Sequence, residues 1–241
     1  MQPELKPIPT REGGYGRGGA DYARDVAAPG VWKVLRNTQL LLALTMVPIA
    51  IGAYFGMQSG GIIQQYPIAG FFVMLGAVIG LQFAIAANRN SGLGVVFLLL
   101  MTGLLGWFIG PLLNFALALS NGAQLVGYAA GGTALIFFGM ATVASVTRRD
   151  FSFMGKFLFV GMIALLLALV ANMFLQIPAL ALTISTLVVV VFSLFLLHDL
   201  SRILRGGETN YIMAATGVYM SLFNIFVHLL HLLMALGGER D

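Results

Sequence analysis

The hydrophobic residues of this chain follow one another in long runs, without the alternation of polar and apolar positions that marks a half-buried strand. A helix rises about 1.5 Å per residue and the hydrocarbon core of a bilayer is about 30 Å thick, so a spanning helix needs about 20 mostly apolar residues. Six runs meet this requirement and are predicted to be spans: residues 39–57, 67–87, 94–117, 123–146, 157–175 and 178–197.

A seventh run, residues 211–236, is long enough to span but contains Asn224, His228 and His231. It is either a seventh span or a segment that re-enters the membrane from one side. We favour a span, because a run of this length makes an awkward re-entrant loop. Polar side chains are costly against lipid, so we expect this semi-polar helix inside the bundle.

Composition agrees with this pattern. Of 241 residues, 59% are hydrophobic and 9% are charged, whereas soluble domains carry about 25% charged residues. So few charges cannot cover a surface exposed to water, which indicates an integral membrane protein. Outer-membrane strands alternate over about ten residues, so the uninterrupted runs favour helices. The predicted fold is an all-α bundle of seven transmembrane helices.

Basic residues occur in every second connection between the predicted spans. They are Lys6, Arg11, Arg17, Arg24, Lys33 and Arg36 before the first span, then Arg89, then Arg148, Arg149 and Lys156, and finally Arg202 and Arg205. By the positive-inside rule this side is cytosolic, which places the N-terminus in the cytosol and, if the seventh run spans, the C-terminus in the periplasm. The net charge of +4 therefore reflects topology, and no nucleic-acid partner is expected.

The first thirty residues differ from the rest of the chain. They are polar and rich in glycine, as in REGGYGRGGADYARD, and contain no apolar core of the kind that a signal peptide needs. Such a segment cannot bury enough surface to fold. We predict two parts: a disordered cytosolic tail, residues 1–30, and a membrane domain, residues 31–241.

Four predicted spans carry two glycines at a spacing of four residues. The pairs are Gly52 and Gly56, Gly76 and Gly80, Gly106 and Gly110, and Gly127 and Gly131. This spacing places both glycines on one face of a helix, where a neighbouring backbone can approach closely. We expect these faces to pack within one chain, in preference to forming a dimer.

Asp199 is the one acidic residue close to a predicted span. A carboxylate in a span is costly, less so near a helix end. Arg202, three residues on, shares its helix face, which favours an interfacial salt bridge. A titratable ion or proton site that faces the bundle interior is an equally good interpretation. We expect weak coupling between Asp199 and the adjacent His198, because neighbouring side chains diverge on a helix.

His228 and His231 share a helix face, as two metal ligands do, but the predicted depth offers no Cys or acidic third ligand. We therefore expect a hydrogen-bonded polar pair, and neither a metal nor another cofactor. The chain lacks Cys, a His-Glu-x-x-His motif, a Gly-x-Ser-x-Gly motif and a P-loop, and a pair of catalytic carboxylates is missing. We do not expect an enzyme.

Seven stretches resemble the Bax inhibitor-1 family, in particular its bacterial YccA-type branch. They are VLRNTQLLLALT (34–45), GPLLN (110–114), GGTALIFF (131–138), TRRDFSFMGKFL (147–158), VANMFLQIPAL (170–180), RGGETNYI (205–212) and VYMSLFNIFVHLL (218–230). The resemblance extends from about Val31 to the end of the chain and implies a bundle in which a central seventh helix is wrapped by six others.

The resemblance to this branch implies an inner-membrane protein that associates with FtsH, the membrane-anchored ATP-dependent protease, and with its HflK/HflC regulators, and that modulates this protease. A cytosolic tail is the kind of segment that such a protease grips. The tail lies outside the matching stretches, so its sequence is no evidence of binding. Modulation of FtsH is the function that we expect.

The wider family implies an alternative, a pH-sensitive calcium or proton leak in which two aspartates on the sixth and seventh helices form a latch. Asp199 in LHDLSRI matches the first aspartate, whereas Ser221 occupies the position of the second. One carboxylate facing a hydroxyl cannot share a proton as a pair of carboxylates does, which is why we favour partner binding. A leak site would comprise Asp199, Ser221, Asn224, Arg89 and Arg202.

Overall fold

The computed structural model describes residues 29–59, 65–147, 151 and 153–237. These residues contain seven helices, one for each predicted segment: α2 (Pro29–Ser59), α4 (Pro67–Ala87), α5 (Gly92–Leu117), α6 (Gly122–Val146), α7 (Met154–Leu175), α8 (Pro178–Leu204) and α9 (Tyr211–Gly237). All seven are long and apolar enough to cross a membrane. The predicted class, an all-α integral membrane protein, is confirmed.

Two helices are longer than the predicted spans. α2 begins at Pro29, since proline suits the first turn of a helix, where its missing N–H has no partner to lose. α8 continues to Leu204, because the first glycine that can end it is Gly206. Asp199 therefore lies inside a helix, with more than one further turn after it. Of the predicted tail, residues 1–28 lie outside the described part of the chain, and its disorder stays a prediction.

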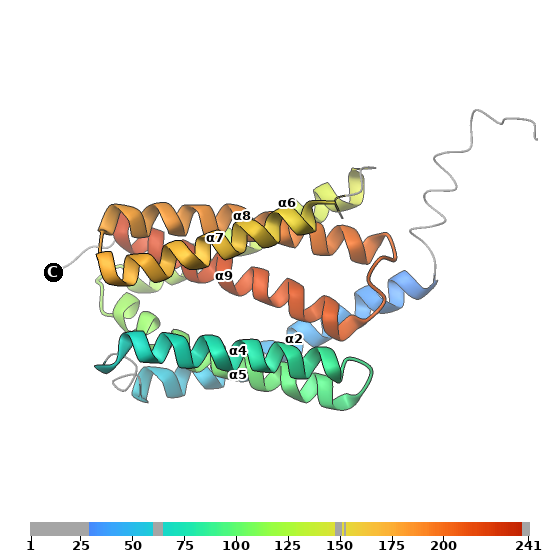
Figure 1. Cartoon of the computed structure of the whole chain (residues 1–241), viewed down its shortest axis with the longest axis horizontal. Coiled ribbons are helices and arrows are strands. Elements are labelled where there is room, and N and C mark those ends of the chain that lie inside the picture. Colours follow the sequence, from blue (N-terminus) through green and yellow to red (C-terminus); the bar gives the residue numbers. More distant parts are fainter. Residues whose placement is uncertain (1–28, 60–64, 148–150, 152, 238–241) are drawn as a thin grey trace, which may run out of the picture.

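The helices form two groups with α9 between them (Figure 1). α2, α4 and α5 pack together on one side, α6, α7 and α8 on the other, and α9 contacts α2, α4, α5, α6 and α8. Tyr219, Ile225 and Leu230 of α9 are almost fully buried, each in a different hydrophobic cluster. The seventh helix is therefore central, as expected, although α7 packs mainly against α8.

α2 and α5 pack backbone to backbone through two of the predicted glycine pairs. A methyl group at Gly56 would lie 2.0 Å from the carbonyl oxygen of Trp107, and one at Gly110 would lie 2.3 Å from the carbonyl carbon of Gly56. Pro111 has no N–H to bond the Trp107 carbonyl within α5, so that oxygen is available to the Cα–H of Gly56. Only glycine permits this approach.

The other two glycine pairs do not pack in this way. A methyl group at any of the four positions would meet no atom of the described chain within 4 Å; they are Gly76 and Gly80 in α4, and Gly127 and Gly131 in α6. The expectation of packing within one chain is therefore correct for α2 and α5 and wrong for α4 and α6, whose glycines face outward.

The connection between α8 and α9 is a tight turn. Gly206 adopts a positive φ of 70°, and the carbonyl of Arg202 accepts hydrogen bonds from the N–H groups of Gly207 (2.9 Å) and Glu208 (3.2 Å). Asn210 then caps α9, because its side-chain oxygen accepts from the N–H groups of Ile212 and Met213 at 3.0 and 3.1 Å. This turn positions the charged groups described below.

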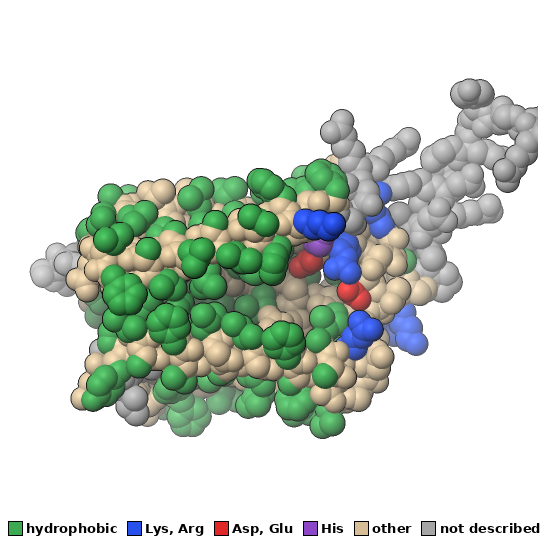
Figure 2. All heavy atoms as spheres, in the orientation of Figure 1, with side chains coloured by type: hydrophobic (Ala, Val, Ile, Leu, Met, Phe, Trp, Pro, Cys, Tyr) green, Lys and Arg blue, Asp and Glu red, His purple; other side chains and the backbone are tan. Residues whose placement is uncertain are grey.

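The charged side chains of the described residues gather at one end of the bundle, where α2 starts and α8 ends (Figure 2). α9 is an unbroken helix that runs from this end to the opposite one (Figure 1). An unbroken helix is the geometry of a span, and a re-entrant segment would need a turn. The described residues thus favour a spanning seventh helix, and the cytosolic location of the charged end stays a prediction.

Candidate ion and proton site

A cavity of about 390 Å³ lies at the charged end, between α8 and α9, with α4 and α7 contributing to its wall. Asp199, Arg202 and Ser221, three of the five predicted site residues, line it together. The polar lining is completed by Gln82, His198, Glu208 and Thr216. The structure thus brings Asp199 and Ser221 to one polar space, and their role as an ion or proton site stays a prediction.

The Asp199 carboxylate lies against α9. A methyl group at Gly217 would lie 2.6 Å from Oδ2 of Asp199, so a residue without a side chain is what makes room for the carboxylate. Gly217 is one helical turn before Ser221, which is 2% exposed, and the two residues share a helix face. The serine and the carboxylate therefore border the same space from neighbouring turns, and the sequence analysis missed the contribution of Gly217.

His198 contacts Asp199 directly. Its Nδ1 lies 3.2 Å from Oδ1 of Asp199, with the side chains 11% and 20% exposed. The expectation that adjacent side chains would diverge is therefore wrong here. Both belong to the last two turns of α8, where they face a cavity that can hold polar groups in place of lipid.

Arg202 pairs with Glu208 and not with Asp199. Its Nη2 lies 3.2 Å from Oε2 of Glu208, and Oε1 of Glu208 accepts a hydrogen bond of 3.0 Å from the N–H of Asn210. Of the two interpretations of Asp199, the salt bridge with Arg202 is thus wrong, and the titratable site stays a prediction. The reason is the turn at Gly206, which folds the chain back so that Glu208 lies over the last turn of α8.

Asn224 and Arg89 are outside the cavity. The Asn224 amide donates a hydrogen bond of 2.8 Å to the carbonyl of Met220 in its own helix. Arg89 contributes its backbone carbonyl, which accepts a hydrogen bond of 2.7 Å from the Asn210 side chain. That bond ties the start of α9 to the loop between α4 and α5. In this conformation these two predicted site residues therefore form hydrogen bonds within a helix and at a loop, and do not line the cavity.

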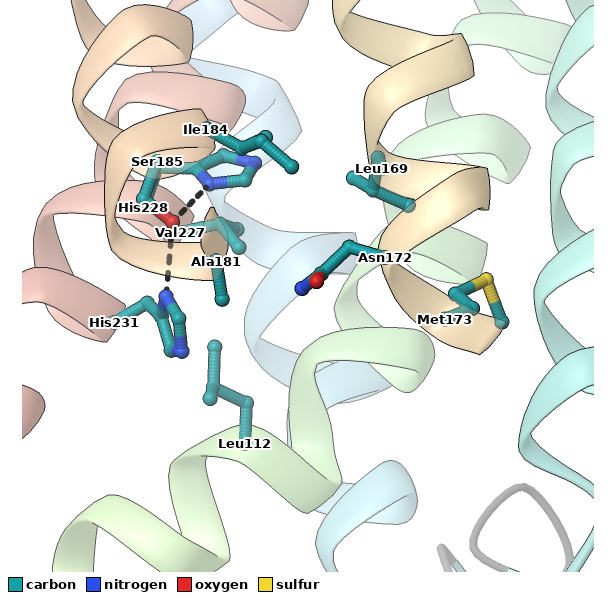
Figure 3. A pocket seen from close by; sticks show the side chains of 10 residues that line it. All are labelled: Leu112, Leu169, Asn172, Met173, Ala181, Ile184, Ser185, Val227, His228 and His231. Atoms are coloured by element: carbon teal, nitrogen blue, oxygen red, sulfur yellow. Dashed lines mark hydrogen bonds between the residues drawn. The ribbon is translucent and has the colours of Figure 1, made fainter. Parts of the chain in front are cut away.

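A second cavity, of about 290 Å³, lies toward the opposite end of α9. His228 and His231 border it, and the Nδ1 atoms of both contact Oγ of Ser185 in α8, at 3.1 and 2.9 Å (Figure 3). The expected hydrogen-bonded pair is confirmed, with Ser185 as the shared partner. Ser185 was not predicted, because α8 contains several hydroxyl residues and the sequence alone does not show which of them faces the histidines.

The family model described as inhibitor of apoptosis-promoting Bax1 matches residues 31–238. The chain belongs to the Bax inhibitor-1 family. The matched region holds α2 from its third residue, the other six described helices, both cavities and the turn at Gly206. Neither the description of the family nor the names of the relatives reported below is that of an enzyme.

Several bacterial relatives of this Bax inhibitor-1 protein are similar over most of their length. The Modulator of FtsH protease YccA of Escherichia coli K12 is 41% identical over 201 residues, which cover 83% of this chain and 89% of the relative. Inner membrane protein YccA of Escherichia coli O6:H1 has the same values. An uncharacterised protein of Pseudomonas aeruginosa is 39% identical over 206 residues, 86% and 90% of the two chains. The chain is a multi-pass membrane protein, and the inner membrane is its location.

Proposed function

We propose that this Bax inhibitor-1 protein associates with FtsH in the inner membrane and modulates its proteolysis, together with HflK/HflC. The observation that carries the proposal is the 41% identity to a relative named as a modulator of that protease, over 83% of this chain. The shared region begins close to the start of α2, so association would use the helical bundle.

The outward glycines of α4 and α6 support a contact with other membrane helices. Gly76 and Gly80, like Gly127 and Gly131, leave the backbone of their helices accessible at the surface of the described chain. Helices associate in lipid through close packing at such small residues, since hydrophobicity alone gives no preference for protein over lipid. These faces are therefore where a transmembrane helix of the protease complex would pack.

Co-purification from mildly solubilised membranes tests the association. We expect FtsH to be recovered with the wild-type chain, and its recovery to fall when Gly76 and Gly80 are replaced by Leu. Ala171→Leu on the exposed face of α7 is the control, because it adds a leucine to the surface away from α4. Recovery that is equal for all three chains would contradict binding through α4. Absence of FtsH from the wild-type sample would reject the proposal itself.

The predicted tail is tested separately. Deletion of residues 1–28 removes the segment that lies before the described helices and before the family match. If the protease engages the chain through this tail, deletion abolishes degradation of the chain and relieves its effect on other FtsH substrates. If modulation resides in the bundle alone, the shortened chain modulates proteolysis as well as the full chain does.

The shared cavity of Asp199 and Ser221 favours a second candidate function, a cation or proton leak. A carboxylate next to an imidazole and a hydroxyl, in a space at the end of a bundle, can take up a proton or a cation. Asp199→Asn removes the charge and keeps the shape. In liposomes it should alter the flux of protons or Ca²⁺ that the wild-type chain supports, and a wild-type chain without flux of either ion would reject this function.

A further inference from the structure

The hydrogen-bond inventory at Ser185 restricts the protonation of the two histidines. A serine hydroxyl has one proton to donate, and Oγ of Ser185 contacts Nδ1 of both His228 and His231. Therefore, when Ser185 donates to one Nδ1, the other Nδ1 must carry a proton and donate to the serine oxygen. Two neutral histidines in this arrangement have opposite tautomers. One presents Nε2–H to its surroundings and the other presents a bare Nε2.

The surroundings of this chain of groups contain no competing charge. Among the described residues that line the cavity, none is Asp, Glu, Lys or Arg, and the two histidines are the titratable ones. Figure 3 shows the second nitrogen of each ring pointing away from Ser185, and Asn172 reaching from α7 toward the histidines. Oδ1 of Asn172 accepts a hydrogen bond of 3.1 Å from the N–H of Ile177. The NH₂ group of the Asn172 amide therefore points away from Ile177.

Between the levels of the two cavities, the polar residues of α9 follow Gly217 along one helix face. Gly217, Ser221, Asn224, His228 and His231 follow one another at intervals of four, three, four and three residues. This is the spacing of residues that share a face. The face begins at the Asp199 carboxylate, which lies against Gly217, and ends at the histidines beside Ser185.

We propose that His231, Ser185 and His228 form a proton relay, and that any ion path through this bundle carries protons and not Ca²⁺. The proposal rests on the second candidate function, the leak around Asp199. In one transfer, Nε2 of His231 takes a proton from water, and its Nδ1–H passes to Ser185 Oγ. The hydroxyl proton of Ser185 passes to Nδ1 of His228, and Nε2–H of His228 is released to water on the side of Ser221 and Asp199.

This transfer conserves atoms and charge, because one proton enters and one leaves and no redox partner is needed. It inverts both tautomers. The relay resets when the Ser185 hydroxyl rotates and each histidine ring gives one proton to water, and takes one from water, on its own side of Ser185, so that the net result of a cycle is one proton moved. Ca²⁺ needs six to eight oxygen ligands. Among the side-chain oxygens that line the cavity at His228 and His231, the described chain offers the Ser185 hydroxyl and an amide oxygen of Asn172 that is already bonded. Imidazole nitrogens suit protons and not this cation.

The test uses the full chain in liposomes, with a pH-sensitive dye or a Ca²⁺ dye inside and a potassium diffusion potential as the driving force. We expect proton flux without Ca²⁺ flux in the wild type. Ser185→Ala and His231→Gln should lower proton flux at least about tenfold, since each removes one proton carrier from the relay. Ser185→Thr keeps the hydroxyl and should retain flux. Ser193→Ala is the matched control, because Ser193 bonds only the Val189 carbonyl of its own helix in the described structure.

The outcomes separate the relay from the leak. Proton flux that survives Ser185→Ala in a folded chain, or Ca²⁺ flux in the wild type, overturns the relay and leaves the leak standing. Flux of neither ion in the wild type overturns both. Nitrogen-15 NMR of labelled histidines gives an independent readout: we expect one Nδ1–H and one Nε2–H tautomer in the wild type, retained in Ser185→Thr and lost in Ser185→Ala. Two identical tautomers in the wild type would contradict the relay.

Discussion

The glycine pairs of α2 and α5 differ from those of α4 and α6 in what surrounds them, although all four pairs have the same spacing. At Gly52, Gly56, Gly106 and Gly110 an added methyl group would lie 2.0 to 2.3 Å from the backbone of the facing helix. At the other four positions it would meet nothing in the described chain. The spacing therefore indicates that a face permits close approach. It does not indicate whether the neighbour belongs to the same chain.

The largest effect should follow from filling the packed interface. Gly56→Leu places a side chain where the Trp107 carbonyl oxygen lies, so α2 and α5 must separate. We expect the free energy of unfolding to fall by more than about 3 kcal/mol, the upper end for overpacked interiors. Thermal unfolding in detergent, followed by far-UV circular dichroism, measures this loss. Gly76→Leu is the matched control on an open face. Equal melting temperatures for the two variants would refute the distinction between the faces.

Substitution of Gly217 should have an effect of intermediate size, because the nearest group is a side chain and not the backbone of a facing helix. A methyl group there would lie 2.6 Å from Oδ2 of Asp199, so the carboxylate must shift, and it also contacts His198 through Oδ1. We expect Gly217→Ala to lower the free energy of unfolding by about 2 kcal/mol. The double variant with Asp199→Ala should recover most of this loss, because the methyl group then has room. If the loss in the double variant equals the sum of the losses in the two single variants, the contact between α8 and α9 is not the cause of the loss in Gly217→Ala.

A smaller effect should follow from the hydrogen bonds at the far end of the packed pair. The Asn114 amide donates to the carbonyl of Met57, and Nε1 of Trp107 donates to Oγ of Ser59 at 2.7 Å. Asn114→Ala should lower the free energy of unfolding by about 1 kcal/mol, the usual net value for one hydrogen bond. Gln124→Ala, at an exposed position of α6, should leave it unchanged. A loss of similar size in both variants would point to a general effect of truncation.

The helices could be predicted from the sequence because long apolar runs need no knowledge of their neighbours. Contacts across the fold could not. Arg202 is three residues from Asp199 on one helix face, yet it pairs with Glu208, because the turn at Gly206 brings that acid closer. Ser185 and His228 are 43 positions apart, and their pairing depends on how α8 and α9 are rotated. Helix spacing defines faces, and packing decides which faces meet.

The smallest effect is expected where a glycine faces open surface. Gly80→Ala adds a methyl group that meets nothing in the described chain, and alanine is the better helix former by about 1 kcal/mol. The free energy of unfolding of the purified chain should therefore stay the same or rise by up to that amount. The same substitution should weaken recovery of FtsH, but less than Gly76→Leu combined with Gly80→Leu, because a methyl group only partly fills the face. A fall in the melting temperature of the purified chain would mean that α4 already packs against a second copy of the protein. In that case the outward glycines serve self-association and do not support a protease contact.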